Sequence, residues 1–378
     1  MTRALTVDSD GHILEPPDMW ERYLEPKYKD RAIRIRRDSN GLEYIEIDRR
    51  PSYMGGGVLG EMGGAYQDPV DLMTPGKVTY WDSALRTPGA IDPDERVKQM
   101  DAEGIDIALL FPTIGICWES DCSDAELSAA YCRAYNNYLF DFCSRHPQRL
   151  IPIAHVNLRD VNLAVAEVER VKNKAKGVFI TPFPGNRRPW GDRYYDPFWG
   201  ACMEAELPVA SHVQVRPDSL GQGLHIPTED PRDNPIWFQA MQLPADSLMA
   251  LNCVFQGGVL ERFPRLKYAV LEAGCGWLPN WIDRADGKWE MFSFATRTRR
   301  RPSEVLRERC WISADVDESC IALAAQEIGA NRLMWATDYP HIDAHRDPLK
   351  ELRRHIASLS PGDQEWILGK TAAELFKL

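Results

Sequence analysis

The chain has 378 residues, a formal net charge of −11 and a sequence pI near 5.3. This acidic balance argues against nucleic acid or an anionic membrane surface as a partner, because both carry negative charge themselves. No run approaches the roughly 18 apolar residues of a membrane span, and residues 1–5 lack the apolar core of a signal peptide. Nine scattered cysteines without a Cys-x-x-Cys pair favour reduced thiols and a cytoplasmic location.

The first predicted element is a short strand, Ala4 to Val7, followed by Asp10 to Pro17. We expect this second segment to be a loop, since its two prolines forbid helix. Asp10 and His12 are two positions apart, so in extended backbone both side chains point to one side and can reach one ion. Glu15 either joins that site or only hydrogen-bonds loop amides, and the sequence leaves both readings open.

An insertion is predicted from about residue 18 to 92. Within it, Arg34–Arg37 and Tyr44–Ile47 alternate around Asn40-Gly41, a strong β-hairpin signal. The glycine-rich stretch from Gly55 to Gly64 follows. No strand leads it into a helix that starts with Lys-Ser or Lys-Thr, so it is not a phosphate loop. We expect it to form a mobile lid near the Asp10 side of the active-site mouth, with a disordered spacer as the alternative.

From Pro93 onward, strand and helix patterns alternate regularly. The expected strands are Ile105–Phe111, Leu150–His155, Gly177–Thr181, Pro208–His212, Leu266–Glu272, Cys310–Ser313 and Arg332–Ala336. The expected helices are Asp94–Glu103, Ala125–Arg145, Asn162–Val171, Asp196–Glu206, Pro235–Leu251, Cys253–Glu261 and Glu318–Ile328, with an irregular segment at Arg216–Asp233.

With the first strand, the count is eight strands in an α/β chain. This pattern predicts a single (β/α)8 TIM-like barrel domain over residues 1–378, with the long hairpin and glycine-rich insertion after strand 1. A doubly wound open sheet is the second choice, disfavoured because no Gly-x-Gly-x-x-Gly follows the first strand.

Polar residues recur where the predicted strands end, and in a barrel these ends meet at one mouth. Imidazole and carboxylate together suit zinc, iron or manganese, and a water bound to such an ion becomes a nucleophile near neutral pH. The candidate metal ligands are Asp10, His12, His212, Glu272 and Asp338, with Glu15 as an open sixth. The candidates for catalytic proton transfer are Asp338, Glu272 and His341. His155 also ends a strand, but we interpret it as a satisfied polar group.

Five stretches together make the chain resemble a known family. They are Asp10-Gly11-His12-Ile13-Leu14-Glu15-Pro16-Pro17, Met100–Asp106, His146–Leu150, Gly257–Lys267 and Thr337-Asp338-Tyr339-Pro340-His341. The chain resembles the amidohydrolase superfamily, in the branch that holds 2-amino-3-carboxymuconate semialdehyde decarboxylase and γ-resorcylate decarboxylase. The resemblance implies a barrel with a divalent ion held by Asp10, His12, His212 and Asp338. It also implies hydrolysis or decarboxylation of a small organic acid or acyl compound.

The sequence departs from that branch in two ways. The first-strand pair is Asp10-x-His12, where relatives carry His-x-His or Glu-x-His. The sixth strand of the decarboxylases ends in a histidine used for proton transfer, and Glu272 stands at the matching position. A decarboxylation that needs that imidazole is therefore in question for this chain.

Three hypotheses of function follow. The first is the metal-dependent hydrolase or decarboxylase. The second is a non-haem di-iron oxygenase on the same barrel, because Glu272 and Asp338, with Glu15 or His341, can hold a second ion in a carboxylate-rich site. The third is a non-catalytic binding protein. In every case we expect a small-molecule ligand and a homodimer, since barrels of this branch commonly associate.

Overall fold

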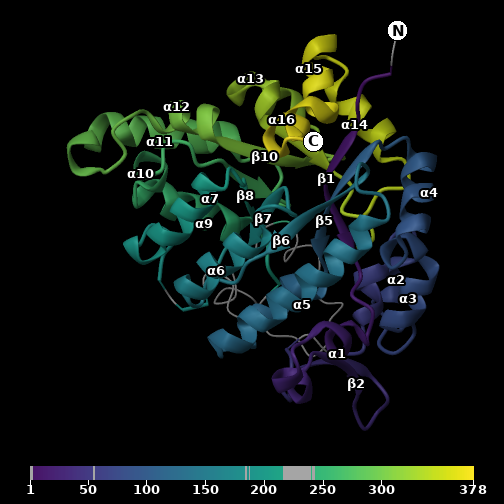
Figure 1. The fold of residues 1–378 in the computed structure, drawn as a ribbon. Helices are drawn as coiled ribbons and strands as arrows, with labels where there is room; N and C mark the ends of the chain where they lie inside the picture. The colour runs from purple at the N-terminus through teal and green to yellow at the C-terminus, as the bar shows by residue number, and fades with distance from the viewer. Residues whose placement is uncertain (1–2, 54–55, 184, 187, 216–239, 241–242) are drawn as a thin grey trace.

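The computed structural model describes residues 3–53, 56–183, 185–186, 188–215, 240 and 243–378 (Figure 1). Eight parallel strands form one sheet, in which each strand pairs with the next along the chain. They are β1 (Val7–Ile13), β5 (Ile107–Pro112), β6 (Leu150–His155), β7 (Gly177–Ile180), β8 (Val209–His212), β9 (Tyr268–Leu271), β10 (Cys310–Asp315) and β11 (Leu333–Ala336).

The sheet closes on itself where its first and last strands meet. The Ser9 hydroxyl donates to the Trp335 carbonyl at 2.5 Å, and the Asp338 N–H donates to the Asp10 carbonyl at 3.1 Å. The His12 N–H donates to the Tyr339 carbonyl at 2.8 Å. The predicted (β/α)8 barrel is therefore confirmed.

Helices surround the sheet, as Figure 1 shows. After β5 and the strands that follow it they are α5 (Ala125–Ser144), α6 (Val161–Val171), α7 (Asp196–Glu204), α9 (Leu243–Gln256), α10 (Val259–Arg262), α11 (Leu278–Phe292), α12 (Pro302–Arg309) and α13 (Ile321–Ile328). The C-terminal region adds α14 (Pro348–Ile356), α15 (Pro361–Glu365) and α16 (Thr371–Phe376). None of the helices in the described ranges is long and apolar enough to cross a membrane.

Most predicted elements lie within a few residues of the observed ones. The helix expected from Glu318 begins instead at Ile321. The Glu318 carboxylate accepts from the N–H groups of Cys275 and Gly276 after β9, and from that of Asp315 at the end of β10. The segment Arg216–Asp233 and the first part of the helix expected at Pro235–Leu251 fall outside the described residues.

The first strand is longer than predicted. Residues Asp10 to Ile13 belong to β1 and were wrongly expected to be loop. The pairing between β1 and β5 shifts register between Asp8 and Gly11, which is a β-bulge, and then resumes with Gly11 opposite Leu110 and His12 opposite Phe111. Every residue of β1 is buried, so burial inside the barrel outweighed the weak strand propensity of Asp and Gly.

The insertion lies between β1 and β5. It contains helices α1 (Met19–Tyr23), α2 (Pro69–Leu72) and α3 (Tyr80–Arg86) and the strands β2 (Arg34–Arg37), β3 (Glu43–Ile47) and β4 (Arg50–Pro51). The predicted hairpin is confirmed, with Ile35 opposite Ile45 in an antiparallel pair. Helix α4 (Pro93–Glu103) then leads into β5.

The described part of the glycine-rich stretch contains a short 3₁₀ helix, η2 (Leu59–Gly63). A β-carbon on Gly63 would lie 2.8 Å from the Leu14 side chain, and one on Gly64 would lie 3.3 Å from Ile342. These neighbours follow β1 and β11, so the stretch lies at the mouth on the Asp10 side, as predicted. In this structure the stretch packs closely against the residues of the mouth. Its movement as a lid stays a prediction.

Candidate metal centre

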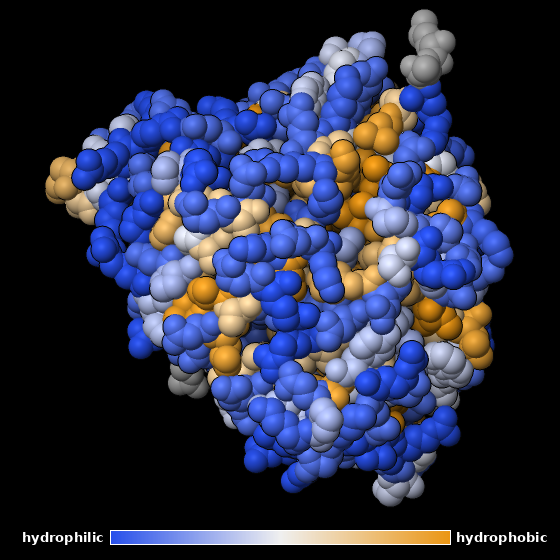
Figure 2. All heavy atoms as spheres, viewed as in Figure 1, coloured by the Kyte–Doolittle hydropathy of each residue, from blue (hydrophilic) through white to orange (hydrophobic). Residues whose placement is uncertain are grey.

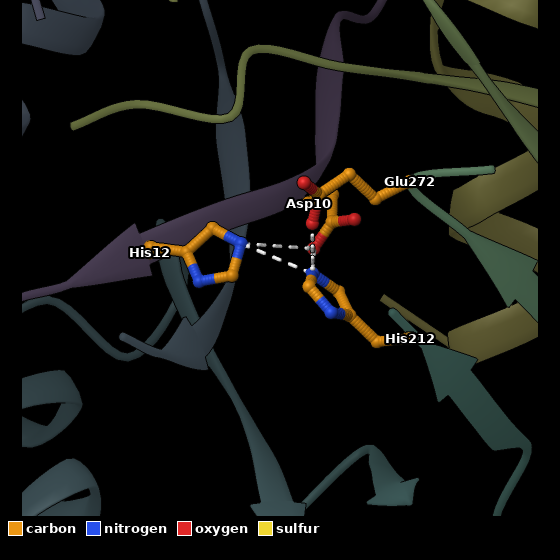
Figure 3. A group of neighbouring side chains, drawn as sticks. All are labelled: Asp10, His12, His212 and Glu272. Carbon is orange, nitrogen blue, oxygen red and sulfur yellow. Dashed lines mark hydrogen bonds and ion pairs between the residues drawn. The ribbon is translucent and has the colours of Figure 1, made fainter. Parts of the chain in front are cut away.

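Two histidines from opposite sides of the barrel point their Nε2 atoms at each other (Figure 3). His12 lies on β1 and His212 ends β8, and both are fully buried. The Nδ1 of His12 lies 2.8 Å from the Pro112 carbonyl, and the Nδ1 of His212 lies 2.9 Å from the Val213 carbonyl. A carbonyl accepts only, so each Nδ1 carries the proton. The two Nε2 atoms, 3.2 Å apart, then face each other with lone pairs in the neutral rings.

Carboxylates from three strands or the residues just after them surround these nitrogens, and Figure 3 draws two of them, Asp10 and Glu272. Asp10 Oδ1 lies 3.4 Å from His212 Nε2 and 3.5 Å from His12 Nε2. Glu272 Oε2, just after β9, lies 3.0 Å from His212 Nε2. Asp338 Oδ1, after β11, lies 3.3 Å from His12 Nε2. The structure thus brings together five of the six residues predicted as ligands.

The oxygens in this group lack the hydrogen bonds that burial normally demands. Both oxygens of Asp10, Oε2 of Glu272 and Oδ2 of Asp338 are buried and have no hydrogen-bond partner. A buried carboxylate without a positive or hydrogen-bonding partner costs on the order of several kcal/mol, so a cation is the natural partner. Imidazole nitrogens and carboxylate oxygens are a suitable donor set for a divalent transition metal ion. The residues present therefore fit the ion that the sequence predicts.

Burial also shifts the protonation equilibria of the site. Burial raises the pKa of Asp10 to about 6, although His212 counteracts it. Burial, then Asp343 and Glu272, raise the pKa of Asp338 well above its usual value. Burial and the neighbouring His341 and His212 lower the pKa of His12. Burial would lower the pKa of His212 too, but Asp10 and Glu272 outweigh it and the pKa is raised.

Two of the acidic residues have an unusual backbone. Glu272 has φ of 50° and Asp338 has φ of 53°, in the left-handed region that L residues other than Asn and Asp seldom adopt. The Glu272 N–H donates to the Ser313 hydroxyl at 3.0 Å, which holds this conformation from the neighbouring strand. Such conformations concentrate at functional sites, because the surrounding structure must enforce them.

His341 lies beside Asp338, on the His12 side of the centre. Its Nδ1 is 2.8 Å from Asp338 Oδ1, and its Nε2 is 3.0 Å from the Thr113 hydroxyl. The imidazole ring packs on that of His12, with ring centroids 4.2 Å apart. His341 can therefore exchange a proton with Asp338, as a residue for proton transfer must.

Glu15 does not reach this group. Its two oxygens accept from the N–H groups of Ile114 at 2.9 Å and Gly115 at 3.1 Å, after β5. The sequence left two readings of Glu15 open, and its position agrees with the one in which it hydrogen-bonds loop amides. As placed here, Glu15 is not one of the residues grouped around the two histidines. Burial raises the pKa of Glu15 to about 7, against the opposing effect of these amides.

Sequence reasoning did not select Asp343, which is close to Glu272 and Asp338: one carboxylate oxygen of each lies within 4.8 Å of the others. The three residues line a cavity of about 350 Å³. Its other acidic and imidazole lining residues are Asp10, Asp315, Asp317 and His345, with no Lys or Arg among the described lining. The only signal in the sequence was that Asp343 stands two positions after His341 in the same turn.

His155, at the end of β6, lies outside the centre. Its Nε2 is 2.6 Å from Glu119 Oε1, and its N–H and carbonyl both bond to the Asn136 side chain. Its interpretation as a satisfied polar group agrees with these contacts, although its Nδ1 has no partner.

Comparison with known proteins identifies the family. The family model described as amidohydrolase matches residues 7–378, so the chain belongs to the amidohydrolase family. Together with the barrel and the donor set at its mouth, this membership makes the chain a metal-dependent enzyme of the hydrolase or lyase type.

Individual relatives give a finer comparison. The γ-resorcylate decarboxylase of Rhizobium sp. (strain MTP-10005) is 26% identical over 299 residues, which cover 75% of this chain and 87% of the relative. A solved amidohydrolase from Mycobacterium avium subsp. paratuberculosis K-10 is 25% identical with a TM-score of 0.80, covering all of both chains. The 5-carboxyvanillate decarboxylase of Novosphingobium aromaticivorans, solved with manganese, has a TM-score of 0.70 at 20% identity over 99% of this chain and 96% of that one.

Proposed function

We propose that this enzyme is a metal-dependent decarboxylase of a small, unsaturated or aromatic carboxylic acid. The observation that carries the proposal is the pair of facing Nε2 atoms of His12 and His212, with the unpartnered carboxylate of Asp10 between them. The similarity to γ-resorcylate decarboxylase supports the reaction type. Manganese in the solved 5-carboxyvanillate decarboxylase favours manganese over zinc or iron as the ion.

Asp10, His12, His212, Glu272 and Asp338 would hold the ion. When bound, it supplies positive charge that orients an anionic substrate and stabilises the electrons left behind as carbon dioxide departs. This charge is essential here, because the described lining of the mouth has carboxylates but no Lys or Arg to attract a substrate carboxylate.

Loss of carbon dioxide from a carboxylate leaves a carbanion-like carbon, which must gain one proton. Asp338 would be ionised as a ligand of the ion, so His341, whose Nδ1 lies 2.8 Å from Asp338 Oδ1, is the residue placed to carry this proton. Glu272 occupies the other side of the mouth and replaces the histidine that decarboxylases of this branch use. We therefore assign proton delivery to His341, which Asp338 orients, and assign Glu272 to metal binding.

The test is metal analysis followed by activity measurement. Protein purified without added metal should contain a stoichiometric divalent ion and release carbon dioxide from a hydroxybenzoic or enoic acid panel. His12→Ala should lose at least about tenfold in metal affinity and lose turnover with it. Wild-type protein that binds no divalent ion, or a His12→Ala variant with full activity, would overturn the proposal.

One observation favours a second candidate function, the di-iron oxygenase. Asp343 extends the acidic group of Glu272 and Asp338, so a second ion can share those two residues with the first. In this case Asp343→Asn should reduce the iron content from about two ions per chain to about one, and substrate should drive oxygen consumption. Turnover at the same rate without oxygen would exclude this function.

We also propose that the protein is a cytoplasmic homodimer. All nine cysteines are free thiols, in keeping with a reducing compartment. Large apolar side chains are exposed at the end of α11 and just beyond it, including Phe294 at 87% exposure, and Figure 2 shows apolar atoms at this end of the molecule. Light scattering that gives the mass of one chain would exclude the dimer.

A further inference from the structure

The two first-strand residues of the metal centre lie on either side of an irregularity. Asp10 is in the β-bulge of β1, and His12 is just after it. A bulged strand loses ladder hydrogen bonds locally, so its geometry depends on other contacts. The relative position of Asp10 and His12 must therefore be fixed from outside the strand.

Arg96, from the first turn of α4, makes those contacts. It is a charged residue with only 1% of its surface exposed. Its Nη1 donates to the His12 carbonyl at 2.8 Å, and its Nη2 lies 3.9 Å from Asp8 Oδ2. The guanidinium carbon lies 4.7 Å from the centre of the Tyr339 ring. The side chain thus touches β1 before and after the bulge, and also the turn that follows β11.

The strand is shaped to admit this guanidinium. A β-carbon on Gly11 would lie 2.4 Å from Arg96 Nη2 and 2.8 Å from Asp8 Oδ2, so the guanidinium and the carboxylate would have to move away from it. Gly11 has no positive φ that would require glycine for conformational reasons. The glycine at the end of the bulge is therefore explained by the space that Arg96 and Asp8 occupy.

Asp8 hydrogen-bonds to the residue that follows the last strand, β11. Its Oδ1 accepts from the Thr337 N–H at 3.0 Å, and its Oδ2 accepts from the Thr337 hydroxyl at 2.7 Å. Thr337 directly precedes Asp338, the acid at the mouth. A continuous buried path, Arg96 to Asp8 to Thr337, links the first-strand ligands to the eighth-strand acid.

We propose that Arg96 is a positioning residue for the metal centre. It fixes the distance between His12 on β1 and Asp338 after β11, and it places one buried positive charge behind an otherwise acidic mouth. This inference rests on the proposed metal site, because it concerns how well that site holds its ion. Residues that orient metal ligands typically change metal affinity by about 10–100-fold when removed.

The experiment measures manganese affinity by chelator competition on folded protein, with circular dichroism as the check of folding. Arg96→Met should weaken manganese binding about 10–100-fold, and Arg96→Lys should restore part of it by returning the charge without the fork of donors. The matched control is Arg262→Met, which removes a guanidinium paired with Asp196 at 2.6 Å outside the centre. It should leave manganese affinity unchanged even where it lowers thermal stability.

Gly11→Ala keeps every charge but fills the space of the guanidinium, so it should weaken manganese binding in the same direction. If Arg96→Met does not fold, Arg96→Lys and Gly11→Ala decide the question. Folded variants with wild-type manganese affinity would overturn the role of Arg96 and leave the proposed function intact. Wild-type protein without a divalent ion would instead overturn the proposed function itself.

Discussion

At the scale of single residues, Glu272 stands where the resemblance to the decarboxylase branch leads one to expect a histidine. Its side chain ends 3.0 Å from His212 Nε2, and its Oε2 has no hydrogen-bond donor. Its left-handed backbone is held by Ser313. A strained acid without a hydrogen-bond partner, beside the Nε2 atoms of two imidazoles, is better explained as a cation ligand than as a structural acid.

We predict that Glu272→Gln loses metal together with turnover, because the amide keeps the shape but removes the charge that the ion requires. The loss in manganese affinity should be at least about tenfold. Asp317→Asn is the control, since Asp317 lines the same cavity with its side chain 57% exposed. A Glu272→Gln variant that keeps its metal but not its turnover would make Glu272 a proton shuttle instead. Retention of both would favour a structural acid and remove the two-ion alternative.

At the scale of elements, helix α4 is part of the metal centre although none of its residues reaches the mouth. Its N-cap, Asp92, accepts from the N–H groups of Asp94 and Glu95, and Arg96 follows in the same turn. The cap therefore fixes both the start of the helix and the place of the guanidinium. Helix α6 begins in the same way, with Asp160 accepting from Asn162 and Leu163, but it carries no residue of the centre.

This pair of caps gives a matched prediction. Asp92→Ala and Asp160→Ala should each lower the free energy of unfolding by about 1 kcal/mol, because each removes two N-terminal hydrogen bonds. Only Asp92→Ala should also weaken manganese binding, through displacement of Arg96. Chemical denaturation and chelator competition measure the two effects. Equal manganese affinities in the two variants would contradict the structural link between α4 and the centre.

At the scale of the whole molecule, the pH dependence of stability reflects its buried acids. Burial raises the pKa of Glu15 to about 7 in the folded state, above its ordinary value of 4.5. The folded protein then binds the proton more tightly than the unfolded chain, so this group makes the fold more stable as pH falls through that window. Above about pH 7 the buried charge of Glu15 lowers the stability of the fold by its full amount. Below the ordinary pKa of 4.5 this destabilisation is absent.

We predict that, when the pH falls from 8 to 5, the metal-free wild type gains stability relative to the metal-free Glu15→Gln variant, measured as the difference between their free energies of unfolding. The shift should amount to up to about 3 kcal/mol, since glutamine does not titrate. Urea denaturation at both values measures it. No shift, or a small shift of the opposite sign, would show that the amides of Ile114 and Gly115 hold the carboxylate ionised throughout.

The sequence by itself determined the architecture and most of the candidate centre. Strand and helix periods are local, and the ends of parallel strands must meet in a closed barrel, so Asp10, His12, His212, Glu272 and Asp338 could be grouped without coordinates. The hairpin was equally local, because Asn40-Gly41 favours one turn between alternating runs.

Only the tertiary structure decided how those residues face one another and what supports them. Glu15 turns to loop amides from β5, Asp343 joins the acids of the mouth, and Arg96 enters the bulge of β1. Each of these contacts joins segments far apart in sequence, and each depends on side-chain direction and available space. Periodicity contains no information about either, because burial and hydrogen bonding between distant segments are settled only when the barrel closes.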